Sequence, residues 1–135
     1  MSSLYLDSCC IIYLIESANP FRDAIVNRLR THGLTPGAIL VTSRLARLEC
    51  RTKPLRDKDD LLLSRYDAFF SAQRFQLIDI SPAIVECATQ LRASYGFKTP
   101  DALHLASAII DKVDVILTGD KDLEKCRDIR VEVVS

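Results

Sequence analysis

The stretch TPDALHLASAII, residues 99–110, carries the clearest structural signal in the chain. Thr99 is a residue type that caps helices, and Pro100 is of the type favoured at the first helical position. Apolar residues then recur at helical spacing as far as Ile110, which predicts a helix with one buried face. Asp101 lies in the first turn, where the helix dipole favours an acidic side chain. The stretch therefore predicts a core helix with a carboxylate at its N-terminal end.

On both sides of this helix, short apolar runs alternate with longer segments of helical periodicity. Such an alternation is typical of an α/β fold with a central parallel sheet flanked by helices. The length of 135 residues and the 48% hydrophobic content suit a single domain, residues 1–135, with a substantial core. We expect strands at 4–6, 39–42, 75–80, 115–118 and 131–134, and further helices at about 10–16, 20–32, 43–51, 57–72 and 81–95.

The composition narrows the class of protein. The 18 basic and 18 acidic residues balance, which argues against a general nucleic-acid binder. The five cysteines form no CxxC pair, so neither a disulfide framework nor a zinc site is expected, and each should pack as a small apolar residue. No apolar run approaches the roughly 20 residues of a membrane span, and no signal peptide is recognisable. We therefore expect a cytoplasmic protein with no membrane partner.

Four acidic residues fall where an α/β sheet usually holds functional groups, beyond the carboxyl ends of its strands. Asp7 ends the first expected strand, and Asp120 follows the fourth. Asp101 opens a helix, and Glu49 lies about two turns into the helix after the second strand. Each residue alone is also explained as a turn, a cap or a solvated helix residue. Together, four carboxylates at one edge would repel one another strongly unless a cation lay between them.

Such a cluster suits one or two Mg²⁺ or Mn²⁺ ions, which prefer oxygen ligands. A divalent ion lowers the pKa of water and neutralises charge on phosphoryl oxygens, so the pattern predicts hydrolysis of phosphodiesters. No convincing Ser-His-Asp or Cys-His arrangement offers a competing chemistry in the sequence. His104, one turn after Asp101, is interpreted either as a partly buried helix residue or as a contact to a phosphate or a carboxylate.

Four segments, taken in order along the chain, carry a family resemblance. They are LYLDS (4–8) with the following IIYL (11–14), SRLARLE (43–49), TPDALHLA (99–106) and LTGDKDL (117–123). In this order they resemble the PIN domain, and specifically the toxin type of VapBC toxin–antitoxin pairs. The resemblance implies one PIN-like domain with strand order 3-2-1-4-5. It also implies a Mg²⁺- or Mn²⁺-dependent endoribonuclease whose metal-binding quartet is Asp7, Glu49, Asp101 and Asp120.

Further residues match positions around this quartet. The resemblance implies that the hydroxyl groups of Ser8 and Thr118 hold carboxylates in place. Asp122 is either a further acidic residue of the site or a solvated turn residue. Cys9 departs from the family pattern, which often has Asn, Ser or Thr at this position, and a thiol is a weak hydrogen-bonding group. This departure bears on the fine positioning of metal or substrate.

The resemblance also implies three partners: an RNA substrate, a cognate antitoxin and a second copy of the chain in a homodimer. Residues 42–58 are rich in Arg and Lys and form either a solvated helix face or a phosphate-contacting surface. In this segment, Leu45 and Leu48 are expected on the apolar side of the helix, with Ala46 as a further candidate. The candidates for contacts with flanking RNA phosphates are Arg44, Arg47, Arg51 and Lys98.

Three other classes of protein are less well matched. A phosphatase-like enzyme with Asp7 as nucleophile needs a second Asp two positions later, where the chain has Cys9. A response-regulator receiver domain needs an acidic pair at the first strand, which is missing. The strongest non-enzyme alternative is a PIN-like binding or assembly module without catalysis. The presence of all four quartet residues favours the nuclease.

Overall fold

The computed structural model of the chain describes residues 2–16 and 20–134, and this part of the chain contains one five-stranded sheet. The strands are β1 (Ser2–Leu6), β2 (Ala38–Ser43), β3 (Phe75–Ile78), β4 (Val115–Thr118) and β5 (Arg130–Val133). Every neighbouring pair is parallel, and the order is β3-β2-β1-β4-β5. The predicted α/β class and strand order are confirmed. All five expected strands are present, with some ends shifted by one or two residues.

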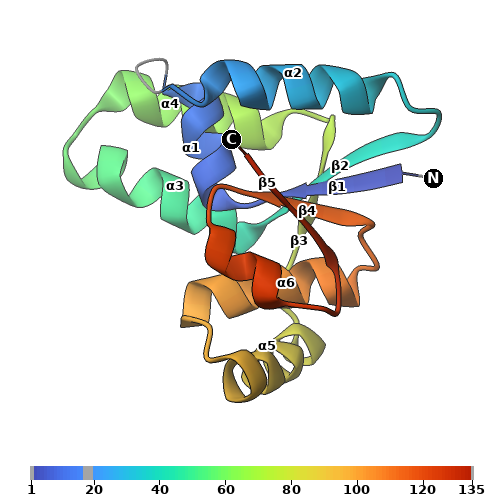
Figure 1. Cartoon of the computed structure of the whole chain (residues 1–135). Helices are drawn as coiled ribbons and strands as arrows, with labels where there is room; N and C mark the ends of the chain where they lie inside the picture. Colours follow the sequence, from blue (N-terminus) through green and yellow to red (C-terminus); the bar gives the residue numbers. More distant parts are fainter. Residues whose placement is uncertain (1, 17–19, 135) are drawn as a thin grey trace.

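Helices cover both faces of this sheet. In Figure 1, the helices nearer the N-terminus lie above and to the left of the sheet, and the two later ones, α5 and α6, lie below it. No helix in the described ranges is both long and apolar enough to cross a membrane. The α-helices are α1 (Ser8–Ile15), α2 (Arg22–Gly33), α3 (Arg44–Arg56), α4 (Asp60–Ser71), α5 (Pro82–Tyr95) and α6 (Thr99–Ile110), and a 3₁₀ helix, η1, spans Lys121–Lys125.

The central strand β1 contributes to a hydrophobic core on each face of the sheet. Leu4 and Leu6 pack with residues of α1–α4, whereas Tyr5 between them packs with residues of α5 and α6. All three side chains are at most 1% exposed. A strand that is buried on both faces has no polar alternation, which explains the continuous apolar run before Asp7. Asp7, the first of the four acidic residues, therefore comes directly after a strand at the buried centre of the molecule.

Helix α6 begins one residue earlier than its sequence predicts. Lys98, not Thr99, is the N-cap residue with an extended backbone, and no side chain caps the helix. Thr99 and Pro100 are the first two helical residues. Proline is tolerated here because the first N–H groups of a helix have no partner within the helix. This shift leaves Asp101 in the first turn, as expected.

Helix α3 runs to Arg56 rather than ending at residue 51. Its buried side chains are Ala46, Cys50 and Pro54, which recur every fourth residue and form one stripe against the core. Leu48 lies off this stripe and is 62% exposed, so the expectation that it lies on the apolar side of the helix is wrong, whereas Ala46 is buried. The stripe sets the rotation of α3 about its axis, and with it the direction of Glu49.

Candidate metal centre

The four predicted acidic residues meet at the carboxyl edge of the sheet. β1 and β4 are neighbours with Leu6 opposite Leu117, so Asp7 and Asp120, which follow these strands, emerge at the same edge. Glu49 reaches this edge from α3 and Asp101 from the first turn of α6. All four line one pocket of about 360 Å³, together with Ser8, Cys9, Ile12 and His104.

Asp7 is the most firmly held of the four carboxylates. It is the N-cap residue of α1, and its Oδ1 accepts hydrogen bonds from the backbone N–H of Cys10 at 3.1 Å and from the thiol of Cys9 at 3.0 Å. Its Oδ2 accepts a hydrogen bond from the hydroxyl of Thr118. The residue is only 6% exposed. These donors satisfy a buried carboxylate and fix its orientation toward the pocket.

Glu49 is held by two side chains from other elements. Its Oε1 accepts hydrogen bonds from Ser8 Oγ at 2.5 Å and from His104 Nε2 at 2.6 Å. Burial alone would raise the pKa of the Glu49 carboxyl, but the hydrogen bonds from His104 and Ser8 outweigh it and hold this pKa below its usual range. Glu49 is therefore kept ionised as well as oriented.

Asp101 carries the clearest sign of like-charge repulsion in the pocket. Burial raises the pKa of Asp101 above its ordinary value, and the charge of Asp120 raises it further. Asp7 and Glu49 act in the same direction, and His104 offsets part of the shift. The pocket thus concentrates negative charge at Asp101, and a bound cation would relieve that repulsion.

Replacing Asp101 by asparagine should stabilise the metal-free protein near neutral pH. Because the folded-state pKa of Asp101 is raised, its contribution to stability is fully present below the unfolded pKa of about 4 and is lost as the pH rises through the folded value. Asparagine avoids this loss. Asp101 is only half-buried, so we expect a modest rise of roughly 2 °C in the unfolding midpoint at pH 7, vanishing near pH 3.

Thermal unfolding of both proteins in EDTA at the two pH values measures this effect. A variant midpoint at pH 7 equal to or below that of the wild type would contradict the repulsion inferred for Asp101.

Asp120 is held mainly through the backbone around it. Its side chain is exposed and accepts a hydrogen bond from the N–H of Asp122 at 2.9 Å, which caps η1. Its own N–H donates to Thr118 Oγ1 at 3.1 Å. Asp122 pairs with Lys125 on the exposed side of η1 and does not line the pocket. The structure therefore places Ser8 and Thr118 against quartet carboxylates and places Asp122 outside the pocket.

Cys9 is part of the site rather than a simple packing residue. It is half-buried, and its sulfur accepts a hydrogen bond from the N–H of Gly119 at 3.2 Å while its thiol donates to Asp7. A Cβ on Gly119 would lie 3.1 Å from this sulfur and 3.0 Å from a ring carbon of Tyr13, so the glycine allows the close approach. Cys9 thus packs against the core and also forms hydrogen bonds within the site, so apolar packing alone does not describe it.

The arrangement of donor atoms suits a hydrated divalent cation. Among the described residues, one group of three potential metal ligands has its ligand atoms within 4.8 Å of one another, and it consists of Asp7, Cys9 and Cys10. No three of the four carboxylates, all of which the structure describes, lie as close together as this. The buried Cys10 thiol donates to the carbonyl of Leu117 and does not line the pocket. The wider spacing of the carboxylates fits Mg²⁺, which keeps several waters and is usually held by one or two carboxylates. The residues present therefore fit the ion that the sequence predicts.

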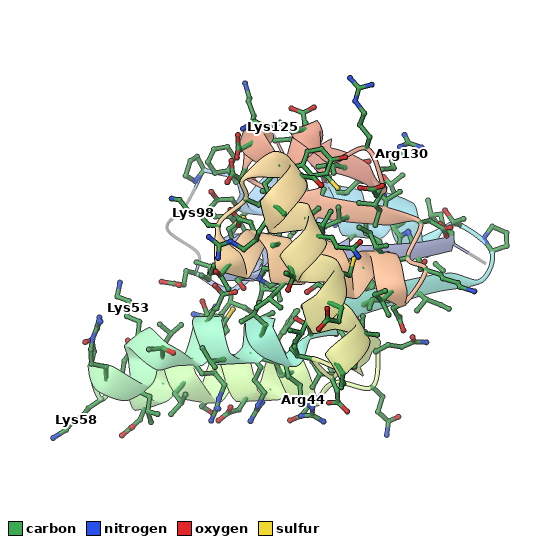
Figure 2. The ribbon with its side chains drawn as sticks, turned by 90° about the horizontal axis from the view of Figure 1, so that it is seen from below. Arg44, Lys53, Lys58, Lys98, Lys125 and Arg130 are labelled. Carbon is green, nitrogen blue, oxygen red and sulfur yellow. The ribbon has the colours of Figure 1, made fainter. Side chains whose placement is uncertain are left out.

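The basic residues predicted to contact RNA do not gather at this pocket. Arg47 and Arg51 pair with Asp67 of α4, at 3.7 and 2.7 Å, and Arg44 pairs with Asp79. Arg47 and Arg51 lie two residues from Glu49, a rotation of about 200° that turns them to another side of α3. These three arginines line a separate pocket with exposed Leu48 and Leu55. Figure 2 shows Lys98 by the start of α6, well separated from Arg44.

The fold and the acidic pocket define an α/β protein with a candidate divalent-metal centre at the carboxyl edge of its sheet. The model of the PIN domain matches residues 4–129, so the chain belongs to the PIN domain family. The family resemblance seen in the sequence is thereby confirmed. No curated protein sequence matches the chain.

Several solved structures share this fold over nearly their whole length. A toxin–antitoxin complex from Klebsiella pneumoniae is 25% identical, with a TM-score of 0.73 and 95% of each chain covered. VapBC2 from Rickettsia felis, bound to a DNA fragment from its promoter, is 19% identical, with a TM-score of 0.81, covering 98% of this chain and 99% of that one. Mycobacterium tuberculosis VapC20, a toxin that cleaves the sarcin-ricin loop, is 14% identical, with a TM-score of 0.75, covering 94% and 98%.

Proposed function

We propose that this chain is a Mg²⁺- or Mn²⁺-dependent endoribonuclease of the VapC toxin type. The observation that carries the proposal is the pocket itself, in which carboxylates from four separate elements meet at one edge of the sheet. A binding module without catalysis has no need to hold four like charges together. The alternative of a catalytically inactive PIN-like module is therefore less well supported.

The quartet would hold one or two divalent ions, with Asp7, Glu49, Asp101 and Asp120 as ligands. Such an ion supplies Lewis acidity, which stabilises charge on a phosphodiester and lowers the pKa of water. Residues of the chain orient these ligands: the hydroxyl of Thr118 donates to Asp7, and the hydroxyl of Ser8 donates to Glu49. Lys98, exposed at the start of α6, is the proposed contact for a flanking RNA phosphate. Arg44, Arg47 and Arg51 would contact RNA only by releasing their present acidic partners.

The proposed partners follow from the toxin assignment. The similar structures from Klebsiella pneumoniae and Rickettsia felis are toxin–antitoxin complexes, which supports a cognate antitoxin as partner of this chain. The VapC20 structure is that of a toxin that cleaves the sarcin-ricin loop, which supports RNA as the substrate class. A homodimer and a cytoplasmic location complete the proposal.

The proposed function is tested by incubating the purified chain, free of antitoxin, with a complex RNA pool in Mn²⁺, Mg²⁺ or EDTA. We expect fragments in at least one metal and none in EDTA, with the cleavage sites mapped by sequencing. An Asp101→Asn variant prepared in the same way controls for contaminating nucleases, because it should produce no fragments. An intact RNA pool after incubation with folded, metal-loaded protein would contradict the proposal.

A further inference from the structure

His104 lies at the centre of a buried hydrogen-bond chain that ends on Glu49. The histidine is on α6, three residues after Asp101 and therefore on the same side of the helix, and it is only 4% exposed. Its Nε2 lies 2.6 Å from Glu49 Oε1, and its Nδ1 lies 2.7 Å from the hydroxyl oxygen of Tyr5. The imidazole thus bridges the middle of the sheet and a carboxylate of the pocket.

The partners of the ring determine which way it faces. Glu49 is ionised and can only accept hydrogen bonds, so the Nε2 of His104 must carry a proton and donate it to Oε1. Ser8 Oγ donates to the same oxygen and lies 3.1 Å from Nε2. Turning the ring over would set a carbon against Glu49 and lose this donor. The orientation of the imidazole is therefore specific and has a direct consequence for the carboxylate.

The other end of the chain is anchored in the core. Tyr5 is fully buried in β1, and its hydroxyl oxygen lies within hydrogen-bond distance of Ser43 Oγ, at 2.8 Å, as well as of Nδ1. Ser43 is the N-cap residue of α3, the helix that carries Glu49, and its Oγ accepts the N–H of Ala46. The aromatic ring of Tyr5 also contacts the imidazole edge-on, with centroids 5.8 Å apart. Residues of β1, α3 and α6 are thus joined through one hydroxyl group.

We propose that His104 is a positioning residue that holds the Glu49 carboxylate in its metal-binding orientation. A free glutamate side chain on a helix surface samples several rotamers, and ordering it costs side-chain conformational entropy. In this structure the buried Tyr5–His104 pair holds the Glu49 carboxylate through the hydrogen bond from Nε2. This inference rests on the proposed metal-dependent function and adds a residue outside the acidic quartet to it.

Two substitutions separate positioning from mere filling of space. In His104→Gln the side-chain amide nitrogen reaches roughly the place of Nε2, so it can still donate to Glu49. In His104→Asn the shorter amide reaches roughly the place of Nδ1, so it can meet Tyr5 but not Glu49. Both variants replace a buried ring by a smaller amide, and each is therefore the control for the other. Thermal unfolding in EDTA verifies that both fold.

The measured quantity is the affinity of each folded protein for Mn²⁺ without RNA, by titration calorimetry. Removing an outer partner of a metal ligand typically weakens binding 10- to 100-fold, so we expect roughly that loss in His104→Asn and recovery to within about 3-fold of the wild type in His104→Gln. If His104→Asn does not fold, Tyr5→Phe, which keeps the ring and removes the anchoring hydroxyl, should weaken Mn²⁺ binding in the same direction.

Two outcomes would overturn the inference alone. One is Mn²⁺ affinity in His104→Asn equal to that of the wild type, and the other is an equal loss in both histidine variants. Absence of Mn²⁺ binding by the wild type itself would overturn the proposed metal-dependent function together with this inference, which makes the two failures distinguishable.

Discussion

Replacing Asp7 by asparagine should reduce metal-dependent RNA cleavage at least about 100-fold, because the pocket loses a charged ligand at its most rigid position. The fold should survive. Asparagine is as good an N-cap as aspartate, and its side-chain oxygen can still accept the N–H of Cys10 at the start of α1. Initial rates of cleavage in Mn²⁺ for variant and wild type, at equal concentration, give the ratio.

The chain offers a matched control for this substitution. Asp59 is also an N-cap residue, at the start of α4, where its side chain accepts the N–H of Leu62 at 3.1 Å. It is exposed and lies outside the acidic pocket. Asp59→Asn therefore makes the same chemical change at the same kind of position and should cleave RNA at the wild-type rate. Equal activity of Asp7→Asn and Asp59→Asn would remove Asp7 from the metal site.

Saturating Mn²⁺ should raise the thermal unfolding midpoint of the protein by roughly 10 °C. The four carboxylates lie far apart in the sequence and meet only in the folded chain, so the ion should bind the folded state selectively. At a free ion concentration 100 times the Kd, such binding stabilises a protein by about 2.7 kcal/mol, which corresponds to about that shift in a domain of this size. Unfolding followed in EDTA and in increasing Mn²⁺ measures it.

The same titration separates metal binding at the pocket from weak binding elsewhere. The shift should be largely lost in Asp7→Asn and retained in Asp59→Asn. Identical midpoints in EDTA and in Mn²⁺ for the wild type would favour the alternative of a PIN-like binding or assembly module without catalysis.

The positions of three of the four quartet residues could be predicted because each of the three has a local signature. Asp7 and Asp120 follow short apolar runs that are buried strands, and Asp101 follows a proline at the start of a long apolar helix. Neighbouring parallel strands end at the same edge of the sheet, so the residues that follow them lie close together. This holds for Asp7 and Asp120 however the helices pack. The roles of these residues remain predictions, but the convergence of Asp7 and Asp120 is a property of the sheet.

The contact between Tyr5 and His104 was beyond sequence reasoning, because it joins different layers of the fold. The contact of Tyr5 with His104 depends on how α6 crosses β1, and no local pattern encodes that crossing. The 3₁₀ helix η1 was not predicted because its five residues are too few to show periodicity. The unexpected exposure of Leu48 has a related cause: a proline-containing stripe of small residues, rather than the leucines, sets which side of α3 is buried.

The order in which the quartet appears along the chain has a consequence for protein synthesis. A ribosome that has translated α5 has already made Asp7 and Glu49, but it has made neither Asp101 nor Asp120. β1 at that stage also lacks β4, the neighbour whose end completes the carboxyl edge of the sheet. A nascent or prematurely terminated chain therefore has no complete pocket. The proposed nuclease activity therefore requires synthesis of the chain through Asp120, the last residue of the pocket.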